Sequence, residues 1–143
     1  MAGHKKVFVS FDWHHDKYYR FLLKAFHAND QFDFEFDDVS SDEINSESVG
    51  RVKAALAVRI RGAQVLMVIV GEHANDHHRD WMSIGYRNWI NFEVATARDA
   101  GLPIVTVMLN PKNDLPEETR GARVYRAESF TDEAITGALR SAW

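Results

Sequence analysis

One run of six residues, Val65–Val70, is apolar at every position. A strand of this composition has to be covered on both faces, which is typical of the central strands of a parallel sheet. The segments Lys6–Phe11 and Ile104–Leu109 share this character. Stretches with helical spacing of apolar residues separate the three runs, and the connections are too long for hairpins. The pattern therefore predicts an α/β fold built from right-handed crossovers.

The other elements complete this pattern. Phe32, Phe34 and Phe36 alternate with acidic residues, which predicts an edge strand with one face toward water. A weaker last strand is predicted at Arg123–Ala127. The predicted helices are Asp16–Ala28, Ser46–Arg61, Tyr86–Ala100 and a last one that starts at Thr131. We therefore predict one domain over residues 1–143, a three-layer, doubly wound, flavodoxin-like fold with a parallel sheet in the strand order 2-1-3-4-5.

The amino-acid composition excludes several kinds of site and partner. The chain has no cysteine, which excludes a disulfide framework, a thiolate nucleophile and a zinc site with cysteine ligands. Its 17 basic and 21 acidic residues give a net charge of −4, so we expect no nucleic-acid partner. No apolar run approaches the roughly 20 residues that span a bilayer, and the first residues lack the apolar stretch of a signal peptide. We expect a cytoplasmic protein with no membrane partner.

The predicted winding also places a site. In such a sheet the ligand crevice lies outside the carboxyl ends of the strands where the winding reverses, here between the first and third strands. The loops Ser10–His15 and Gly71–Gly85 should line it. Neither GxGxxG nor GxxxxGK[ST] occurs, which excludes the common dinucleotide and triphosphate loops. A phosphate-accepting receiver domain shares the winding, but this chain has Gly71-Glu72 and Arg126 where that class needs Asp and Lys.

Glu93 occupies an unusual position in the predicted helix Tyr86–Ala100. At about 100° per residue it lies about 60° from the axis of the apolar stripe, whereas Phe92 should point away from it. A carboxyl group placed where burial is expected is a candidate functional acid. The alternative is a boundary residue that reaches water or pairs with Arg87 or Arg98.

Other side chains of the predicted crevice could bind a ligand. Trp89 lies one helical turn before the acid, where its ring could stack on a nucleobase or nicotinamide or only pack against the domain. Phe11 and Asp12 extend from the first strand into the crevice. The acidic stretch from Asp37-Asp38 to Asp42-Glu43 is either a solvated loop or a partner for ribose hydroxyls. Loop histidines and one aspartate could instead converge on a metal, although no HExxH spacing occurs. These candidate ligands are His14, His15, Asp16, His73, His77 and His78.

Several segments match a known pattern. They are Val7–Phe11, Phe34–Asp37, Arg61–Gly71, Asn88–Ala95 and Gly101–Val105. Over nearly its whole length the chain thereby resembles the TIR-like domains of bacterial Thoeris anti-phage defence systems. The most informative match is the Trp-x-x-x-Glu element of Trp89 and Glu93.

The resemblance implies a function. Enzymatic TIR domains cleave NAD+ at the nicotinamide–ribose bond, and Glu93 matches their essential glutamate. The product would be a cyclic or conjugated ADP-ribose that activates a separate effector protein, with NAD+ as substrate, no cofactor and no metal. The expected substrate-binding residues are Ser10, Phe11, Asp12, Asp37, Asp38 and Trp89. Two alternatives stay open, a non-catalytic module that works by self-association and a histidine–metal hydrolase. Self-association could also accompany activation of the enzyme.

Overall fold

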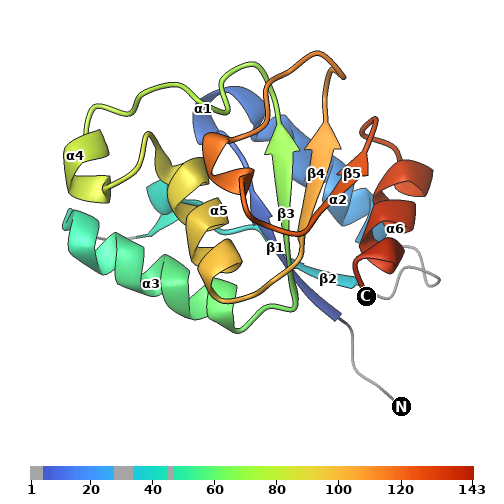
Figure 1. Ribbon diagram of the computed structural model, residues 1–143, viewed down its shortest axis with the longest axis horizontal. Helices are drawn as coiled ribbons and strands as arrows, with labels where there is room; N and C mark the ends of the chain where they lie inside the picture. The colour runs from blue at the N-terminus through green and yellow to red at the C-terminus, as the bar shows by residue number, and fades with distance from the viewer. Residues whose placement is uncertain (1–4, 28–33, 45–46) are drawn as a thin grey trace.

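A five-stranded parallel sheet forms the centre of the molecule, with the strand order β2-β1-β3-β4-β5 (Figure 1). The computed structural model describes residues 5–27, 34–44 and 47–143. The strands are β1 (Lys5–Ser10), β2 (Phe34–Asp37), β3 (Val65–Val70), β4 (Ile104–Met108) and β5 (Val124–Ala127). All neighbouring pairs run parallel. The predicted fold class and strand order are therefore confirmed.

Helices cover both faces of the sheet (Figure 1). One face packs against α2 (Tyr18–His27) and α6 (Asp132–Ser141). The other packs against α3 (Val49–Arg61), α4 (Trp81–Ile84) and α5 (Trp89–Asp99). Three short turns complete the structure, namely α1 (Trp13–Asp16), η1 (Ser41–Glu43) and η2 (Glu117–Thr119). No helix in the described ranges is both long and apolar enough to cross a membrane.

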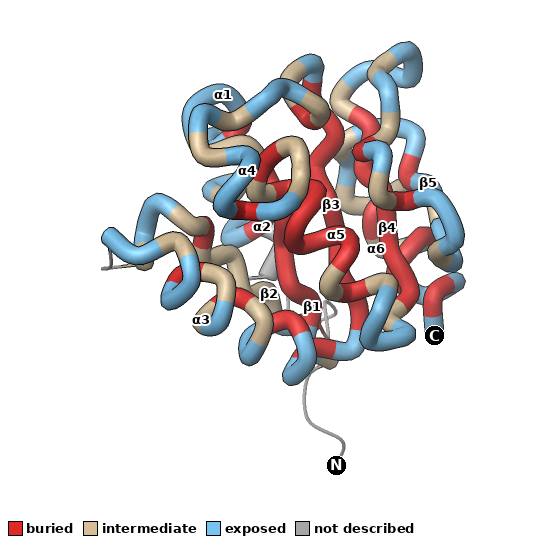
Figure 2. The backbone as a smooth tube through the Cα atoms, turned by 60° about the vertical axis from the view of Figure 1, so that its left-hand side comes forward, coloured by how far each residue is buried: buried red, intermediate tan, exposed pale blue. Residues whose placement is uncertain are grey.

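The two cores follow from the alternation of side chains along each strand. In β3, Val65, Met67 and Ile69 face the α2/α6 side, and the other three residues face the α3/α5 side. Every residue of β3 is at most 1% exposed, and the strand lies among buried segments in Figure 2. The unbroken apolar run is therefore the sequence counterpart of a strand covered on both faces.

The first predicted helix is two helices in the structure. Its first turn, α1, begins at Trp13, because the Asp12 carboxylate accepts hydrogen bonds from the N–H groups of His14 and His15 and caps it. The second, α2, begins at Tyr18. Predicted boundaries at Ala28, Phe32 and Ser46 lie outside the described residues.

The helix predicted from Tyr86 begins three residues later. Asn88 is its N-cap, since the Asn88 side chain accepts a hydrogen bond from the Asn91 N–H at 2.9 Å. The preceding residues form the separate short helix α4, which ends at Gly85 in the left-handed conformation (φ 86°). The predicted helix start at Tyr86 is therefore wrong, because a capping asparagine and a glycine turn separate two helices.

Candidate active site

A pocket of about 210 Å³ lies at the carboxyl ends of β1 and β3, the edge at which the winding predicted a site. Four parts of the chain line it. They are residues within 11–15 after β1, 40–42 after β2, 73–78 after β3, and the first turns of α5. Both loops that were predicted to flank the crevice therefore contribute to the pocket.

Glu93 lines this pocket although its side chain is almost fully buried, with 3% exposure. The Ser10 hydroxyl donates a hydrogen bond of 2.7 Å to Glu93 Oε1. Ser10 shares a face of β1 with Phe8, and that face packs against α5, so the alternation of the strand aims the hydroxyl at the acid. The helical spacing predicted the burial of Glu93, and the structure confirms it.

The two arginines that could have paired with Glu93 have other partners. Arg98 contacts Asp99 and Glu118, each at 3.0 Å. Arg87 Nε lies 3.3 Å from a carboxylate oxygen of Glu117. The interpretation of Glu93 as a boundary residue that reaches water or pairs with these arginines is therefore wrong.

The environment of Glu93 favours its neutral form. Burial raises the pKa of Glu93 to about 8, and the negative charge of Asp37 adds to this effect. The hydrogen bond from Ser10 lowers the pKa but does not offset the burial. A cationic ligand beside the carboxyl group would shift it back toward ionisation. The site can thus hold either a proton or a positive charge at this position.

Aromatic rings form part of the pocket beside the acid. Phe11 and Trp89 both line it. Trp89 also packs edge-on against Phe92, with ring centroids 5.7 Å apart, so it serves the core as well as the pocket. Phe92 is only 6% exposed, and Lys53 of α3 lies over its ring. The expectation that Phe92 points away from the core is wrong, because α3 covers that face of α5.

Of the two polar candidates near β1, only Asp12 lines the pocket. Its carboxylate accepts the N–H groups of His14 at 2.9 Å and His15 at 3.2 Å. Ser10 is fully buried behind Glu93 and reaches the pocket only through that side chain. The structure therefore places the Ser10 hydroxyl where it positions the acid, and does not bring it to the pocket lining.

Asp37 and Asp38 do not reach the pocket lining. Asp37 binds Arg59 Nη1 through both carboxylate oxygens, at 2.9 and 3.0 Å. An oxygen of Asp38 lies 4.0 Å from Arg20 Nε. The structure therefore does not bring these two aspartates to the pocket lining, because each carboxylate is turned toward an arginine.

The loop after β2 lies within the acidic stretch that was a candidate partner for ribose hydroxyls, and it contributes three residues that were not named singly as site residues. Ser40, Ser41 and Asp42 line the pocket in place of the two preceding aspartates. A usable signal existed, because the predicted order places β2 beside β1, and parallel strands end at the same edge of a sheet. The predicted winding therefore also places this loop at the site.

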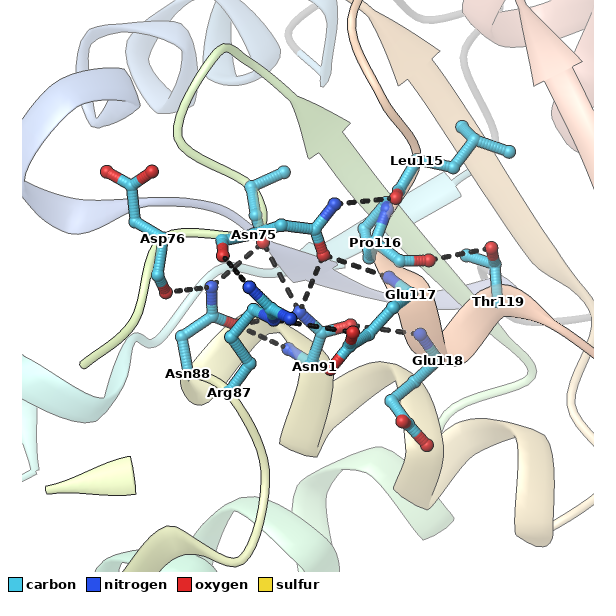
Figure 3. A network of polar contacts seen from close by, with 11 residues as sticks. Asn75, Asp76, Arg87, Asn88, Asn91, Leu115, Pro116, Glu117, Glu118 and Thr119 are labelled. Atoms are coloured by element: carbon cyan, nitrogen blue, oxygen red, sulfur yellow. Dashed lines mark hydrogen bonds and ion pairs between the residues drawn. The ribbon is translucent and has the colours of Figure 1, made fainter. Parts of the chain in front are cut away.

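A buried cluster of amide side chains holds the His-rich loop after β3 (Figure 3). Asn88 Nδ2 donates to the carbonyl oxygens of Ala74 and Asp76, both at 2.9 Å. Asn91 is fully buried, and its Nδ2 lies within 3.3 Å of three acceptors, on Ala74, Asn75 and Asn88. The start of α5 and the loop are thereby fixed to each other, which orders one side of the pocket.

The same amides reach the turn η2 (Figure 3). Asn75 Oδ1 accepts the N–H of Glu117 at 2.9 Å, and Asn91 Oδ1 accepts the N–H of Glu118 at 3.0 Å. The N–H groups of Glu117 and Glu118 thus find side-chain acceptors, which satisfies both sides of the contact. The sequence carried no signal for this network, because its members lie up to 43 residues apart (Asn75 to Glu118) and share no motif.

The loop histidines are arranged as pairs. The rings of His15 and His73 stack with centroids 3.6 Å apart. His73 Nδ1 contacts Asp76 at 2.7 Å, and His15 Nδ1 contacts Asp12 at 3.2 Å. Within residues 5–27, 34–44 and 47–143, no three metal-ligating side chains come together in a way that could hold an ion. This arrangement gives the metal-hydrolase alternative no support.

A second buried carboxylate lies under the loop. Asp16 is 8% exposed, its Oδ2 has no hydrogen-bond partner among the described residues, and burial followed by the charge of Asp12 raises its pKa to about 6. A methyl group on Gly71 would overlap Asp16 Oδ2 and stand 3.0 Å from its Cγ. Position 71 therefore favours glycine because the Asp16 side chain approaches it closely, and not because of its backbone conformation.

We expect Gly71→Ala to lower the free energy of unfolding by about 1–3 kcal/mol, because overpacking a closed site forces neighbours to move. Urea denaturation measures this change. In an Asp16→Ala background the same substitution should cost less than half as much, since the obstructing carboxylate is gone. Equal costs in both backgrounds would show that the overlap with Asp16 is not the cause.

Comparison with known proteins places these features in a family. A family profile described as Thoeris protein ThsB, TIR-like domain, matches residues 8–114. A search of curated proteins gives no significant match. Among solved structures, the chain is similar to the structure of Clostridium botulinum CMP N-glycosidase, BcmB, with a TM-score of 0.58 and 13% sequence identity. The alignment covers 97% of this chain and 100% of that chain, and shows a shared fold.

The matched segment contains the end of β1, all of β3, the His-rich loop and Glu93, which are the main parts of the pocket. It spans well over half of the 143 residues. This chain therefore belongs to the family of TIR-like domains of the Thoeris protein ThsB.

Proposed function

We propose that this domain is an enzyme of bacterial anti-phage defence that cleaves NAD+ at the bond between nicotinamide and ribose. The observation that carries the proposal is a buried glutamate, held by Ser10 at 2.7 Å, in a pocket with aromatic rings. Membership of the Thoeris family supports the defence role. The structural neighbour is named for cleaving an N-glycosidic bond of a nucleotide, and this supports the bond type.

The reaction needs one negative charge beside the ribose. When the C1′–N bond of NAD+ breaks, its electron pair returns to the ring nitrogen, and nicotinamide leaves as a neutral molecule without a proton. Positive charge develops at the same time on C1′ and the ring oxygen of the ribose. The Glu93 carboxylate would stabilise this charge, as carboxylates do in the cleavage of glycosides.

The raised pKa of Glu93 is compatible with this role. The free enzyme holds the side chain largely protonated at neutral pH. NAD+ carries a positive pyridinium ring, and its binding beside Glu93 would favour the carboxylate and release the proton to water. The cost of ionising a buried acid is thereby offset only when the correct cationic substrate is present.

The second step is capture of the ribosyl cation. Attack by water yields ADP-ribose and one proton, attack by a nucleophilic atom of the adenosine half yields a cyclic product, and attack by another molecule yields a conjugate. The near-complete burial of Glu93 limits the access of water. We therefore propose a cyclic or conjugated ADP-ribose as the signal that activates a separate effector protein, formed in the bacterial cytoplasm without a cofactor or metal.

A specific observation favours a second candidate function. A glutamic acid that is protonated at neutral pH can donate its proton to a leaving base, which a pyrimidine nucleotide requires and NAD+ does not. The similar fold of a CMP N-glycosidase is consistent with that chemistry. The second candidate is therefore a nucleoside 5′-monophosphate N-glycosidase that uses Glu93 as its acid.

The two functions are separated by their products. Protein purified from uninfected and from phage-infected cells is incubated with NAD+ or with CMP, and chromatography follows nicotinamide and cytosine. We expect nicotinamide to appear in equal amount to the NAD+ consumed. Cytosine release with intact NAD+ would favour the second function. If neither preparation cleaved either substrate, the enzymatic proposal would be abandoned in favour of a module that acts by self-association.

A further inference from the structure

The pocket concentrates histidines at its opening. Five of the seven histidines of the chain line it. Their side chains are exposed or half-buried, for example 47% for His15 and 35% for His73, whereas Glu93 is 3% exposed. A ligand that reaches the acid therefore passes a rim of imidazoles. The histidine rim consists of His14, His15, His73, His77 and His78.

These imidazoles are the cationic groups available to a ligand in the pocket. Among the described residues that line it there is no lysine or arginine. The nearby Arg20 donates to Glu43 at 2.8 Å, and Arg59 binds Asp37. Any positive charge offered to a ligand must therefore come from protonated histidine.

Two carboxylates orient the stacked imidazoles of the rim. Asp12 contacts Nδ1 of His15 and Asp76 contacts Nδ1 of His73, which leaves the Nε2 atoms of the two stacked rings for a ligand. The hydrogen bond to Asp76 raises the pKa of His73, although partial burial opposes it. The charged groups that act on the two rings from the surrounding elements are Asp12, Asp16, Glu72 and Asp76.

The size of the pocket indicates which part of a ligand it encloses. Its 210 Å³ is below the roughly 300–1,000 Å³ of sites that enclose whole drug-sized ligands. With a base and its ribose placed near Glu93, the group attached to the ribose 5′ carbon would lie toward the more exposed histidines. In a nucleotide that group is a phosphate, which accepts charge-assisted hydrogen bonds from imidazolium groups.

We propose that the histidine rim binds the 5′-phosphate of the nucleotide whose ribose reaches Glu93, so that the site selects nucleotides over nucleosides. This inference rests on the proposed N-glycosidic chemistry and holds for NAD+ and for a nucleoside monophosphate alike. It also assigns the orientation of the substrate, with the scissile bond inside the pocket and the phosphate at the opening. When the imidazoles are neutral, carboxylates such as Asp12, Asp42 and Asp76 would repel the phosphate instead.

Binding of ribose 5-phosphate and ribose, measured by calorimetry at pH 6 and pH 8, tests the proposal without any turnover. At pH 6 ribose 5-phosphate should bind at least about tenfold more tightly than ribose, because one charge-assisted hydrogen bond contributes about a factor of ten. The preference should shrink by pH 8. The double variant His15→Gln/His73→Gln should lose most of it at pH 6.

Arg79→Gln is the matched control, because Arg79 is a highly exposed cation of the same loop that does not line the pocket. It should keep the full preference for the phosphate. Equal affinities for the two sugars at pH 6, including no detectable binding of either, would overturn the proposal, and so would a preference that survives in the double variant. Cleavage of NAD+ by the same preparation is scored separately, so failure of the phosphate site and failure of the proposed function are distinguishable.

Discussion

Glu93→Gln should lower the rate of NAD+ cleavage at least about a hundredfold while the protein stays folded. The substitution keeps the shape of the side chain and an oxygen that can accept the Ser10 hydroxyl, but it removes the negative charge. Loss of one electrostatic partner of a developing charge typically lowers a rate by about 10²–10³. Initial rates of nicotinamide release from protein of infected cells provide the measurement.

The matched control is Glu133→Gln, which removes an exposed glutamate of α6 that does not line the pocket. This variant should cleave NAD+ at close to the wild-type rate. Circular dichroism and the urea midpoint of both variants report whether the fold is intact. If wild type and Glu93→Gln consumed NAD+ equally, the catalytic role of Glu93 would be refuted, whatever the activity of the control.

The sheet could be predicted because its physical requirements are local. A run such as Val65–Val70 has no polar face, so it can lie only where both faces are covered. The alternating phenylalanines of β2 mark an edge for the opposite reason. Once the strands are divided in this way into central and edge strands, right-handed crossovers leave few possible strand orders. Helix boundaries were predicted less well, because caps such as Asn88 depend on single side chains.

The burial of Glu93 could also be predicted from local sequence, whereas the contacts of the polar residues around it could not. Helical spacing places Glu93 beside the apolar stripe, and this relation is local in sequence. Asp37 and Asp38 looked equally suited to a ribose, but Arg59 and Arg20 draw them away. These arginines lie on α3 and α2. Such long-range ion pairs depend on tertiary packing, which the spacing of apolar residues in the sequence does not indicate. The amide network around Asn91 is long-range in the same sense.

Stability should depend on pH through Glu93. Folding raises the pKa of this group from its ordinary value of 4.5 to about 8, so between these pH values the folded state holds a proton that the unfolded state has lost. The free energy of unfolding must then fall as pH rises, by up to about 1.4 kcal/mol for each pH unit. Above pH 8 both states are ionised and this dependence ends.

Other groups change stability in the same direction and must be separated from Glu93. The pKa of Asp16 is raised from 3.8 to about 6, so its effect on stability lies mainly below pH 6.5. The pKa of His73 is also raised, so the stability that this group contributes is lost as pH rises through its pKa in the folded protein. Urea unfolding of wild type and Glu93→Gln between pH 6.5 and 8 isolates the glutamate, because the other groups are common to both proteins. We expect the variant to gain about 1–2 kcal/mol relative to wild type over this interval. Parallel curves would mean that Glu93 does not carry a proton in the folded protein. The carboxylate would then be ionised before any substrate arrives, and a cationic substrate would no longer be needed to ionise the site.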